Sequence, residues 1–205
     1  ITHALYPVAP HLKTPLLEQL LKTVGPGSVL VFTRTKHRAK KLAENLKRAQ
    51  FSVTSLQGNL SQNRRQEAME GFRKGTYQVL VATDIASRGI DISTVTHVIN
   101  YDIPDTVEAY THRIGRTGRA TRTGDAFTLT SPEDNAMVRT IERVLGYNIE
   151  CKTLSDFDYT RAAARSNEFA RAPRPPRQSH GSAPRRDHRG PRAQDDRRPR
   201  SEERR

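Results

Sequence analysis

Short runs of β-branched and aliphatic residues alternate along this chain with longer segments of helical periodicity, and this alternation restricts the possible fold most strongly. The pattern predicts strands at 29–33, 53–56, 79–82, 95–100 and 125–130. It predicts helices at 11–23, 35–48, 61–74, 105–113 and 132–145. Strands that alternate with helices in this way build a parallel sheet covered by helices on its faces. We therefore predict a doubly wound, parallel α/β fold.

The composition of the chain changes near residue 160. Residues 161–205 contain 14 arginines, no lysine, six prolines and six acidic residues, a net charge of +8, and Phe169 is their only aromatic residue. A segment so poor in apolar side chains cannot bury enough surface to offset the entropy lost on ordering. We therefore predict a folded domain over residues 1–155 and a disordered, Arg/Pro-rich basic tail over residues 156–205.

The net charge of the whole chain is +13, which favours a polyanionic partner. No basic amphipathic helix with bulky apolar residues stands out, so nucleic acid is a better candidate than a membrane. The longest apolar runs are too short to span a bilayer, and the N-terminus has no signal-peptide pattern, so we expect a cytoplasmic protein. With one cysteine, Cys151, and scattered histidines, the sequence has neither a disulfide framework nor zinc-ligand spacing, and we predict no metal site.

Polar residues gather in the loops that follow the predicted strands, and ligands of open α/β sheets bind beyond the carboxyl ends of the strands. These loops contain Thr33-Arg34-Thr35-Lys36, Gln57-Gly58-Asn59, and the run from Thr83 to Asp91. The last run combines an arginine, which can pair with phosphate, with carboxylates that can accept hydrogen bonds from ribose hydroxyls. Thr35 fits the N-cap of the following helix equally well.

The run from His112 to Arg119 contains three arginines and two glycines in eight residues. The guanidinium of arginine is always charged, and its planar fork of donors matches the oxygens of a phosphate. The glycines let the backbone turn sharply. We interpret the run as a phosphate clamp, and the alternative is a solvated surface loop.

Four segments of the chain resemble, in order and spacing, motifs IV, IVa, V and VI of the DEAD-box RNA helicases. They are Val29 to Thr35, Gln57-Gly58 with Gln62-x-x-Arg65, Thr83 to Asp91, and His112 to Arg119. The resemblance covers about residues 1–150, and around Gln57 to Arg65 the chain is most similar to the bacterial RhlE group. It implies a RecA-like domain, the second of a two-domain motor.

The motifs expected of the first domain of such a motor, the glycine-rich P-loop and the Asp-Glu-Ala-Asp sequence, do not occur in these 205 residues, and the chain begins at Ile1. We therefore expect a fragment of a longer protein. The resemblance implies that ATP and Mg²⁺ are held mainly by the N-terminal RecA-like domain. Alone, this chain should hydrolyse ATP negligibly.

The resemblance also implies roles for single residues. Arg116 and Arg119 would be arginine fingers acting on the γ-phosphoryl group, Asp91 would accept from the ATP ribose, and Gly89 would lie against the nucleotide. His112 and Arg113 would couple this domain to its N-terminal partner, while Asp84 could either brace its loop or make a direct contact. Contacts to the RNA backbone are implied for Arg34, Thr35, Gly58, Gln62, Arg65, Thr83, Arg88 and Gly89.

Two other functions are compatible with these residues. One is a DNA helicase or translocase of the same superfamily, and the other is a non-catalytic RNA-binding module with the same fold. The tail lies outside the resemblance, and we interpret its arginines as a nonspecific RNA tether, with a solubilising segment as the alternative. Deletion of residues 161–205 would distinguish these, because only loss of a tether weakens RNA binding and its salt dependence.

Overall fold

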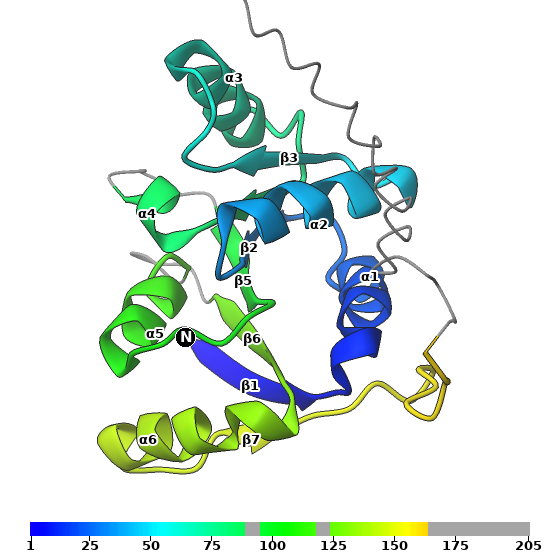
Figure 1. The fold of residues 1–205 in the computed structure, drawn as a ribbon, viewed down its shortest axis with the longest axis vertical. Coiled ribbons are helices and arrows are strands. Elements are labelled where there is room, and N and C mark those ends of the chain that lie inside the picture. Colours follow the sequence, from blue (N-terminus) through cyan, green and yellow to red (C-terminus); the bar gives the residue numbers. More distant parts are fainter. Residues whose placement is uncertain (89–94, 118–123, 164–205) are drawn as a thin grey trace, which may run out of the picture. The chain divides into compact units, whose positions relative to one another are not determined.

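The computed structural model describes residues 1–88, 95–117 and 124–163, and all of them belong to the first of two compact units, which spans Ile1–Arg165. Within this unit the strands form one parallel sheet (Figure 1). The strands are β1 (Thr2–Pro7), β2 (Ser28–Phe32), β3 (Val53–Leu56), β4 (Val79–Ala82), β5 (Val95–Asn100), β6 (Asp125–Thr130) and β7 (Glu150–Cys151). Their order across the sheet is β3-β4-β2-β5-β6-β1-β7.

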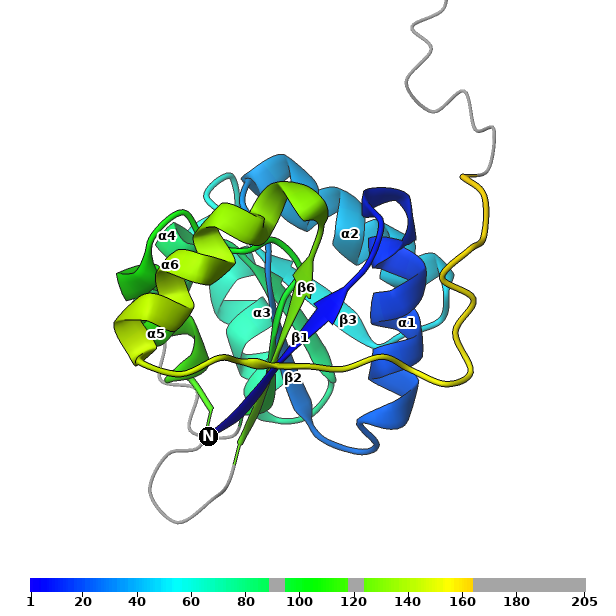
Figure 2. The same cartoon turned by 90° about the horizontal axis from the view of Figure 1, so that it is seen from below.

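Helices cover both faces of this sheet. They are α1 (Lys13–Thr23), α2 (Lys36–Arg48), α3 (Gln62–Arg73), α4 (Asp84–Ser87), α5 (Val107–Ile114) and α6 (Asn135–Leu145), with 3₁₀ turns at Pro10–Leu12 and Pro132–Asp134. Alternate residues of β2 point to opposite faces: Val29 and Val31 pack with α1 and α2, whereas Leu30 and Phe32 pack with α3 to α6. Figure 2 shows α1 on one side of the strands and α5 and α6 on the other. The predicted parallel α/β fold is thus confirmed.

Most of the predicted strands and helices occur in the structure at or near their predicted positions. Strands 53–56, 79–82, 95–100 and 125–130 match their predicted bounds, and β2 begins and ends one residue earlier than predicted. The sequence analysis missed β1, α4 and β7. The helix α4 and the strand β7 are short, and β1, although six residues long, carries only three consecutive apolar residues, Ala4 to Tyr6, before Pro7. Cys151, the last residue of β7, is exposed.

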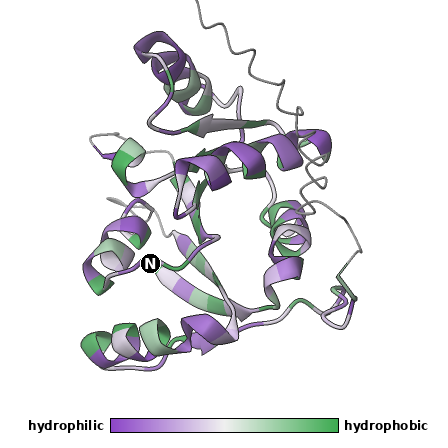
Figure 3. Ribbon diagram, viewed as in Figure 1, coloured by the Kyte–Doolittle hydropathy of each residue, from purple (hydrophilic) through white to green (hydrophobic). Residues whose placement is uncertain are grey.

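Two helices show how packing decides which apolar residues are buried. In α2 the helical periodicity predicts an apolar face made of Ala39, Leu42, Ala43, Leu46 and Ala49. All but Ala49 are buried, while the outer face of the helix is hydrophilic (Figure 3). In α6 the apolar periodicity of the sequence predicts that Met137, Ile141, Val144 and Leu145 are buried, and this prediction is wrong in part. Only Ile141 is fully buried, and Val144 is 67% exposed. The contacts of α6 are mainly with α5 and the turn at Pro132–Asp134, so only a narrow stripe of the helix is covered.

The packing of the domain extends past the predicted boundary at residue 155. Phe157 and Tyr159 pack against the core cluster on the α1 and α2 side, and the Tyr159 hydroxyl accepts from the Leu154 amide at 2.9 Å. His11 Nε2 lies 2.8 Å from the carbonyl oxygen of Arg161. The sequence analysis placed Phe157 and Tyr159 in the tail although their aromatic surface favours burial. Residues 164–205, most of the predicted tail, lie outside the described residues.

The described residues contain no helix that is both long enough and apolar enough to cross a membrane.

Candidate functional site

The carboxyl ends of four neighbouring strands bring the predicted site segments to one edge of the sheet. Because β3, β4, β2 and β5 are adjacent and parallel, the loops that follow them lie side by side. The loop after β3 reaches α2 where Lys36 Nζ donates to Asn59 Oδ1 at 3.0 Å. Arg65 of α3 reaches α4, where its Nη2 donates to the Ala86 carbonyl at 2.7 Å.

Two of the predicted RNA-binding threonines cap helices at this edge. The Thr35 hydroxyl accepts from the Arg38 amide at 3.2 Å, and the Thr83 hydroxyl accepts from the Ala86 amide at 3.4 Å. The N-cap interpretation of Thr35 is therefore confirmed. Thr83 is buried and Thr35 is exposed, so only Thr35 presents much surface to a partner.

Arg113 joins the loops after β4 and β5 from inside the domain. Its Nε and Nη2 donate to the two carboxylate oxygens of Asp84, both at 2.6 Å. Its Nη1 donates to Asn100 Oδ1 at 3.2 Å and to the Asp102 carbonyl at 2.8 Å. The guanidinium also lies 4.9 Å from the centroid of the Phe32 ring. We call Arg113 and these polar partners the Arg113 network; within it Asp84 braces its loop, which is one of the two roles left open for it.

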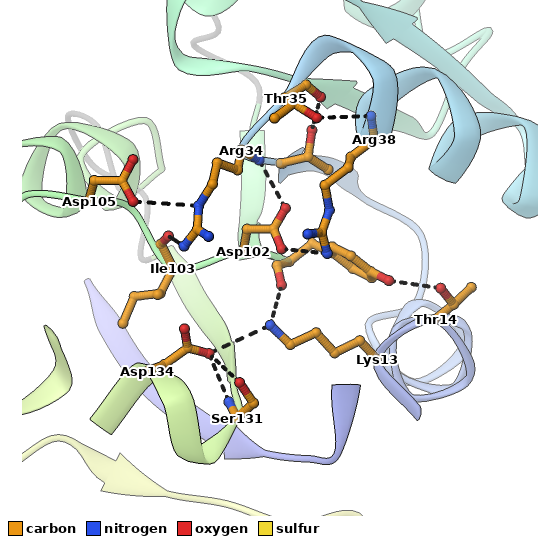
Figure 4. A network of polar contacts seen from close by, with 12 residues as sticks. Lys13, Thr14, Arg34, Thr35, Arg38, Asp102, Ile103, Asp105, Ser131 and Asp134 are labelled. Carbon is orange, nitrogen blue, oxygen red and sulfur yellow. Dashed lines mark hydrogen bonds and ion pairs between the residues drawn. The ribbon is translucent and has the colours of Figure 1, made fainter. Parts of the chain in front are cut away.

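Asn100 and Asp102 are functional-site residues that the sequence analysis missed. The Asn100 side chain is completely buried and donates to the Thr128 hydroxyl at 3.0 Å while accepting from Arg113. Asp102 is 3% exposed and accepts from the Arg34 amide and from Arg38 Nη2, both at 2.9 Å (Figure 4). The signal that could have found them is their position: polar residues that follow the apolar pair Val98-Ile99 at the carboxyl end of the central strand β5 face the same edge as the other loops.

The surroundings of Asp102 form a wider polar network, shown in Figure 4. Arg34 Nε lies 3.4 Å from Asp105 Oδ1, and the buried Lys13 donates to the Tyr101 carbonyl at 3.3 Å. The Tyr101 hydroxyl lies 2.9 Å from that of Thr14. Burial raises the pKa of Tyr101, partly offset by the hydrogen bond with Thr14 and by the charge of Arg38. Two cationic side chains, Arg34 and Arg38, thus lie at the start of α2 close to Asp102.

A small hollow lies between α4 and α5 at this edge. Its volume is about 80 Å³, and its lining includes Asp84, Arg88, His112, Arg113 and Arg116. Pockets that hold whole small molecules usually measure about 300–1,000 Å³. The hollow can therefore take only part of a nucleotide, such as a phosphate group, for which its arginines supply the matching charge.

The geometry of the chain after α5 points Arg116 to this hollow. The helix ends at Ile114, and tight turns follow in which the Arg116 amide donates to the Arg113 carbonyl at 3.1 Å. The buried Thr117 hydroxyl lies 3.0 Å and 2.9 Å from the carbonyl oxygens of Val95 and Thr96. This anchor fixes the turn directly after Arg116.

The predicted site residues divide into three groups. Arg88, His112 and Arg116 line the hollow together with Asp84 and Arg113. Arg34, Thr35, Gly58, Gln62, Arg65 and Thr83 lie on loops and helix starts at the same edge of the sheet, and a Cβ added at Gly58 would meet nothing within 4 Å. The third group, Gly89, Asp91 and Arg119, lies outside the described residues.

A second hollow, of about 650 Å³, lies at the opposite edge of the sheet, where Gly25 and Gly27 precede β2 and Ser28 begins it. None of the predicted site residues lines it. Within the described residues no group of three His, Cys, Asp or Glu side chains could hold a metal ion.

The family of the helicase conserved C-terminal domain matches residues 12–121. The DEAD-box ATP-dependent RNA helicase CshA of Bacillus subtilis is 47% identical over 131 residues, which are 64% of this chain and 26% of CshA. The pre-mRNA-splicing ATP-dependent RNA helicase PRP28 of Pyricularia oryzae is 45% identical over 130 residues, 63% of this chain and 19% of PRP28. The chain thus spans about a quarter of the length of the curated relatives it matches.

Solved structures give the same result. The structure of the Escherichia coli DEAD-box protein SrmB bound to regulator of ribonuclease activity A (RraA) contains a chain that matches with a TM-score of 0.73 and 36% identity, covering 80% of this chain and 98% of that chain. Saccharomyces cerevisiae Dbp5 bound to RNA and ADP BeF3 matches with a TM-score of 0.68 and 33% identity, covering 75% of this chain and 41% of that chain.

Proposed function

This chain belongs to the DEAD-box RNA helicases, whose conserved C-terminal helicase domain it carries, and on that premise we propose that it is one half of an ATP-driven motor that unwinds or remodels RNA. The observation that carries the proposal is the hollow between α4 and α5. It collects Arg88, His112 and Arg116 from two segments far apart in the sequence, and it is too small for a whole nucleotide. Such a half-site fits a nucleotide sandwiched between two domains.

On the nucleotide side, the chain's own residues would stabilise charge rather than react. ATP, with Mg²⁺ held mainly by the N-terminal RecA-like domain, supplies the transferable phosphoryl group. Arg116, and by family resemblance Arg119, would neutralise the charge that develops on that group, an effect worth about 10³–10⁵ in rate where arginine fingers have been measured. Asp91 would accept from the ribose with Gly89 beside it, and His112 would face the N-terminal domain.

On the RNA side, the loops after β2, β3 and β4 would bind the sugar-phosphate backbone of a single strand. Arg34, Thr35, Gly58, Gln62, Arg65, Thr83, Arg88 and Gly89 are the proposed contacts. Contacts of this kind position a strand without reading its sequence, and recognition of 2′-hydroxyls would explain a preference for RNA. The proposed role of Arg113 in coupling to the N-terminal domain would act through Asp84, because the Arg113 guanidinium is buried among partners from its own domain.

Three further assignments belong to the same proposal. We place the protein nearest the bacterial RhlE group, on the sequence around Gln57 to Arg65. The arginine-rich segment 161–205 would act as an RNA tether in a cytoplasmic protein. Its physiological targets would be single-stranded and duplex RNA without sequence preference, since backbone contacts do not distinguish bases.

The test is ATP turnover by the full-length protein with and without RNA, for the natural sequence and for Arg116→Ala. We expect RNA to stimulate turnover and the substitution to lower the rate by at least about 10³-fold while ATP binding is nearly retained. Arg139→Ala, at an exposed position on α6, is the matched control and should change nothing. Equal stimulation by DNA would favour the DNA translocase, and a tight RNA complex indifferent to ATP would favour the non-catalytic module. Unchanged turnover in Arg116→Ala would refute the finger assignment.

A further inference from the structure

Asp102 occupies an unexpected position for an acidic residue. It lies two residues beyond the carboxyl end of the central strand β5, next to Arg34 in the loop after β2 and Arg38 in the first turn of α2. If these loops bind RNA, a carboxylate here repels the phosphates of the strand. A carboxylate in this place must therefore contribute something to RNA binding that outweighs its repulsion of the phosphates, if the loops bind RNA.

The contacts of Asp102 indicate what that role is. One carboxylate oxygen accepts from the Arg34 main-chain amide and the other from the Arg38 guanidinium, both at 2.9 Å. The side chain of Asp102 is only 4% exposed, so water competes little for these oxygens. The two contacts of the Asp102 carboxylate hold both ends of segment 34–38, at the start of α2, against the end of β5 (Figure 4).

The main chain of Asp102 connects this clamp to the rest of the site. Its carbonyl oxygen accepts from Arg113 Nη1 at 2.8 Å, so the residue is held from the opposite side by the Arg113 network. The carboxylate is therefore presented to segment 34–38 from a fixed position. Fixed donors and acceptors of this kind lower the entropy cost of binding, because the bound geometry exists in advance.

We infer that Asp102 is a positioning residue for RNA: it does not touch the strand, but holds Arg34 and Thr35 in the arrangement that the RNA backbone meets. The inference rests on the proposed function, in which segment 34–35 contacts RNA. It assigns a role to a residue outside the four motifs recognised in the sequence.

The inference predicts the sign of a change in affinity. Charge alone predicts that neutralising an acid near bound RNA tightens binding. Positioning predicts that it weakens binding, because in Asp102→Asn one acceptor is replaced by an amide N–H that faces another donor. A matched control is available in Asp105, which pairs with Arg34 Nε at 3.4 Å but has a side chain that is 77% exposed.

The experiment measures binding of a fluorescent ten-nucleotide uridine RNA to the full-length protein, with a non-hydrolysable ATP analogue present. For Asp102→Asn we expect the Kd to rise about tenfold, the effect of one buried charge-assisted hydrogen bond. For Asp105→Asn the Kd should stay unchanged or fall about twofold, as expected for an exposed pair. Titration with excess RNA should show that all of the Asp102→Asn protein still binds, only more weakly, whereas a merely structural defect would reduce the fraction of protein that binds in proportion to its folded fraction.

Unchanged or tighter binding by Asp102→Asn overturns the inference. Arg34→Ala separates this failure from a failure of the proposed function. If Arg34→Ala weakens binding and Asp102→Asn does not, Asp102 has no positioning role; if neither weakens it, segment 34–35 does not bind RNA.

Arg38→Gln provides a second variant in case Asp102→Asn does not fold, since the Arg38 side chain is 47% exposed and its loss should be tolerated. We expect its Kd to rise about threefold with the salt dependence unchanged. A direct phosphate contact by Arg38 would instead lower the slope of log K against log salt by about 0.7. That result would overturn the inference, because it would mean that Arg38 pairs with an RNA phosphate instead of with Asp102. An unchanged Kd for Arg38→Gln would overturn the inference as well.

Discussion

Arg113→Met tests whether the Arg113 network holds the two halves of the candidate site together. Methionine keeps most of the volume of the side chain and removes all of its donors. The guanidinium is 3% exposed and bonds Asp84, Asn100 and the Asp102 carbonyl, so the substitution breaks contacts to the loops after both β4 and β5. We expect a large loss of stability and a displaced α4.

The magnitude follows from what each partner loses. Asn100 Oδ1 and the Asp102 carbonyl would become buried acceptors without a donor, at about 1–3 kcal/mol each. The side chain of Asp84 is 42% exposed and can be hydrated, so its ion pair adds no more than about 1 kcal/mol. The total is about 2–7 kcal/mol. For a domain of this size, in which 1 kcal/mol shifts Tm by about 2–4 °C, it corresponds to a fall in Tm of roughly 5–25 °C.

The assay is urea denaturation of the 205-residue chain followed by circular dichroism, with Arg139→Met as the control at an exposed helical position. The control should change the free energy of unfolding by less than about 0.5 kcal/mol. In a double-mutant cycle, Asp84→Asn should cost little once Arg113 is replaced, because its partner is already gone. A loss below about 1 kcal/mol for Arg113→Met would refute the reasoning, since the buried acceptors would then have found other donors.

Two further predictions concern the rest of the domain. Burial lowers the pKa of His97 below its ordinary 6.5, although the charge of Asp125 raises it. The folded state therefore binds fewer protons than the unfolded state, and the free energy of unfolding should fall as the pH drops below about 6.5. In His97→Gln this pH dependence, measured by urea denaturation at several pH values, should be weaker, and an unchanged profile would contradict the assignment. A Cβ at Gly71 would lie 2.6 Å from the Tyr77 ring, so Gly71→Ala should lower the free energy of unfolding by about 1–2 kcal/mol despite the better helix propensity of alanine. In a Tyr77→Ala background the same substitution should raise the free energy of unfolding. A rise in the natural background would disprove the clash.

The parts of the fold that follow from local sequence were predictable, and those that depend on distant partners were not. The strand Val79–Ala82 is apolar throughout because both of its faces are buried, and such a run is visible without any structure. In contrast, β7 is two residues long and exists through its pairing with Ala4 and Leu5. The exposure of Val144 likewise depends on where α6 lies, which its periodicity does not specify.

The candidate site divides in the same way. The loops after β2, β3 and β4 were recognisable from their residue types and their place after apolar strands. The roles of Asn100 and Asp102 were not, because each acts on a residue far away in the sequence: Asn100 bonds Thr128, and Asp102 bonds Arg34 and Arg38. A single sequence does not reveal which of its distant residues come into contact in the folded chain.

The run from His112 to Arg119 shows why sequence alone could not divide its arginines by role. Arg113 lies in the last turn of α5, where the helix turns its side chain into the domain towards Asp84. The helix ends at Ile114, and the turn that follows, anchored by Thr117 on the carbonyl oxygens of β5, brings Arg116 to the hollow instead. The end of the helix thus separates a guanidinium that maintains the fold from one that lines the hollow, and substitutions of Arg113 and Arg116 should differ accordingly: the first should act on stability, the second on turnover.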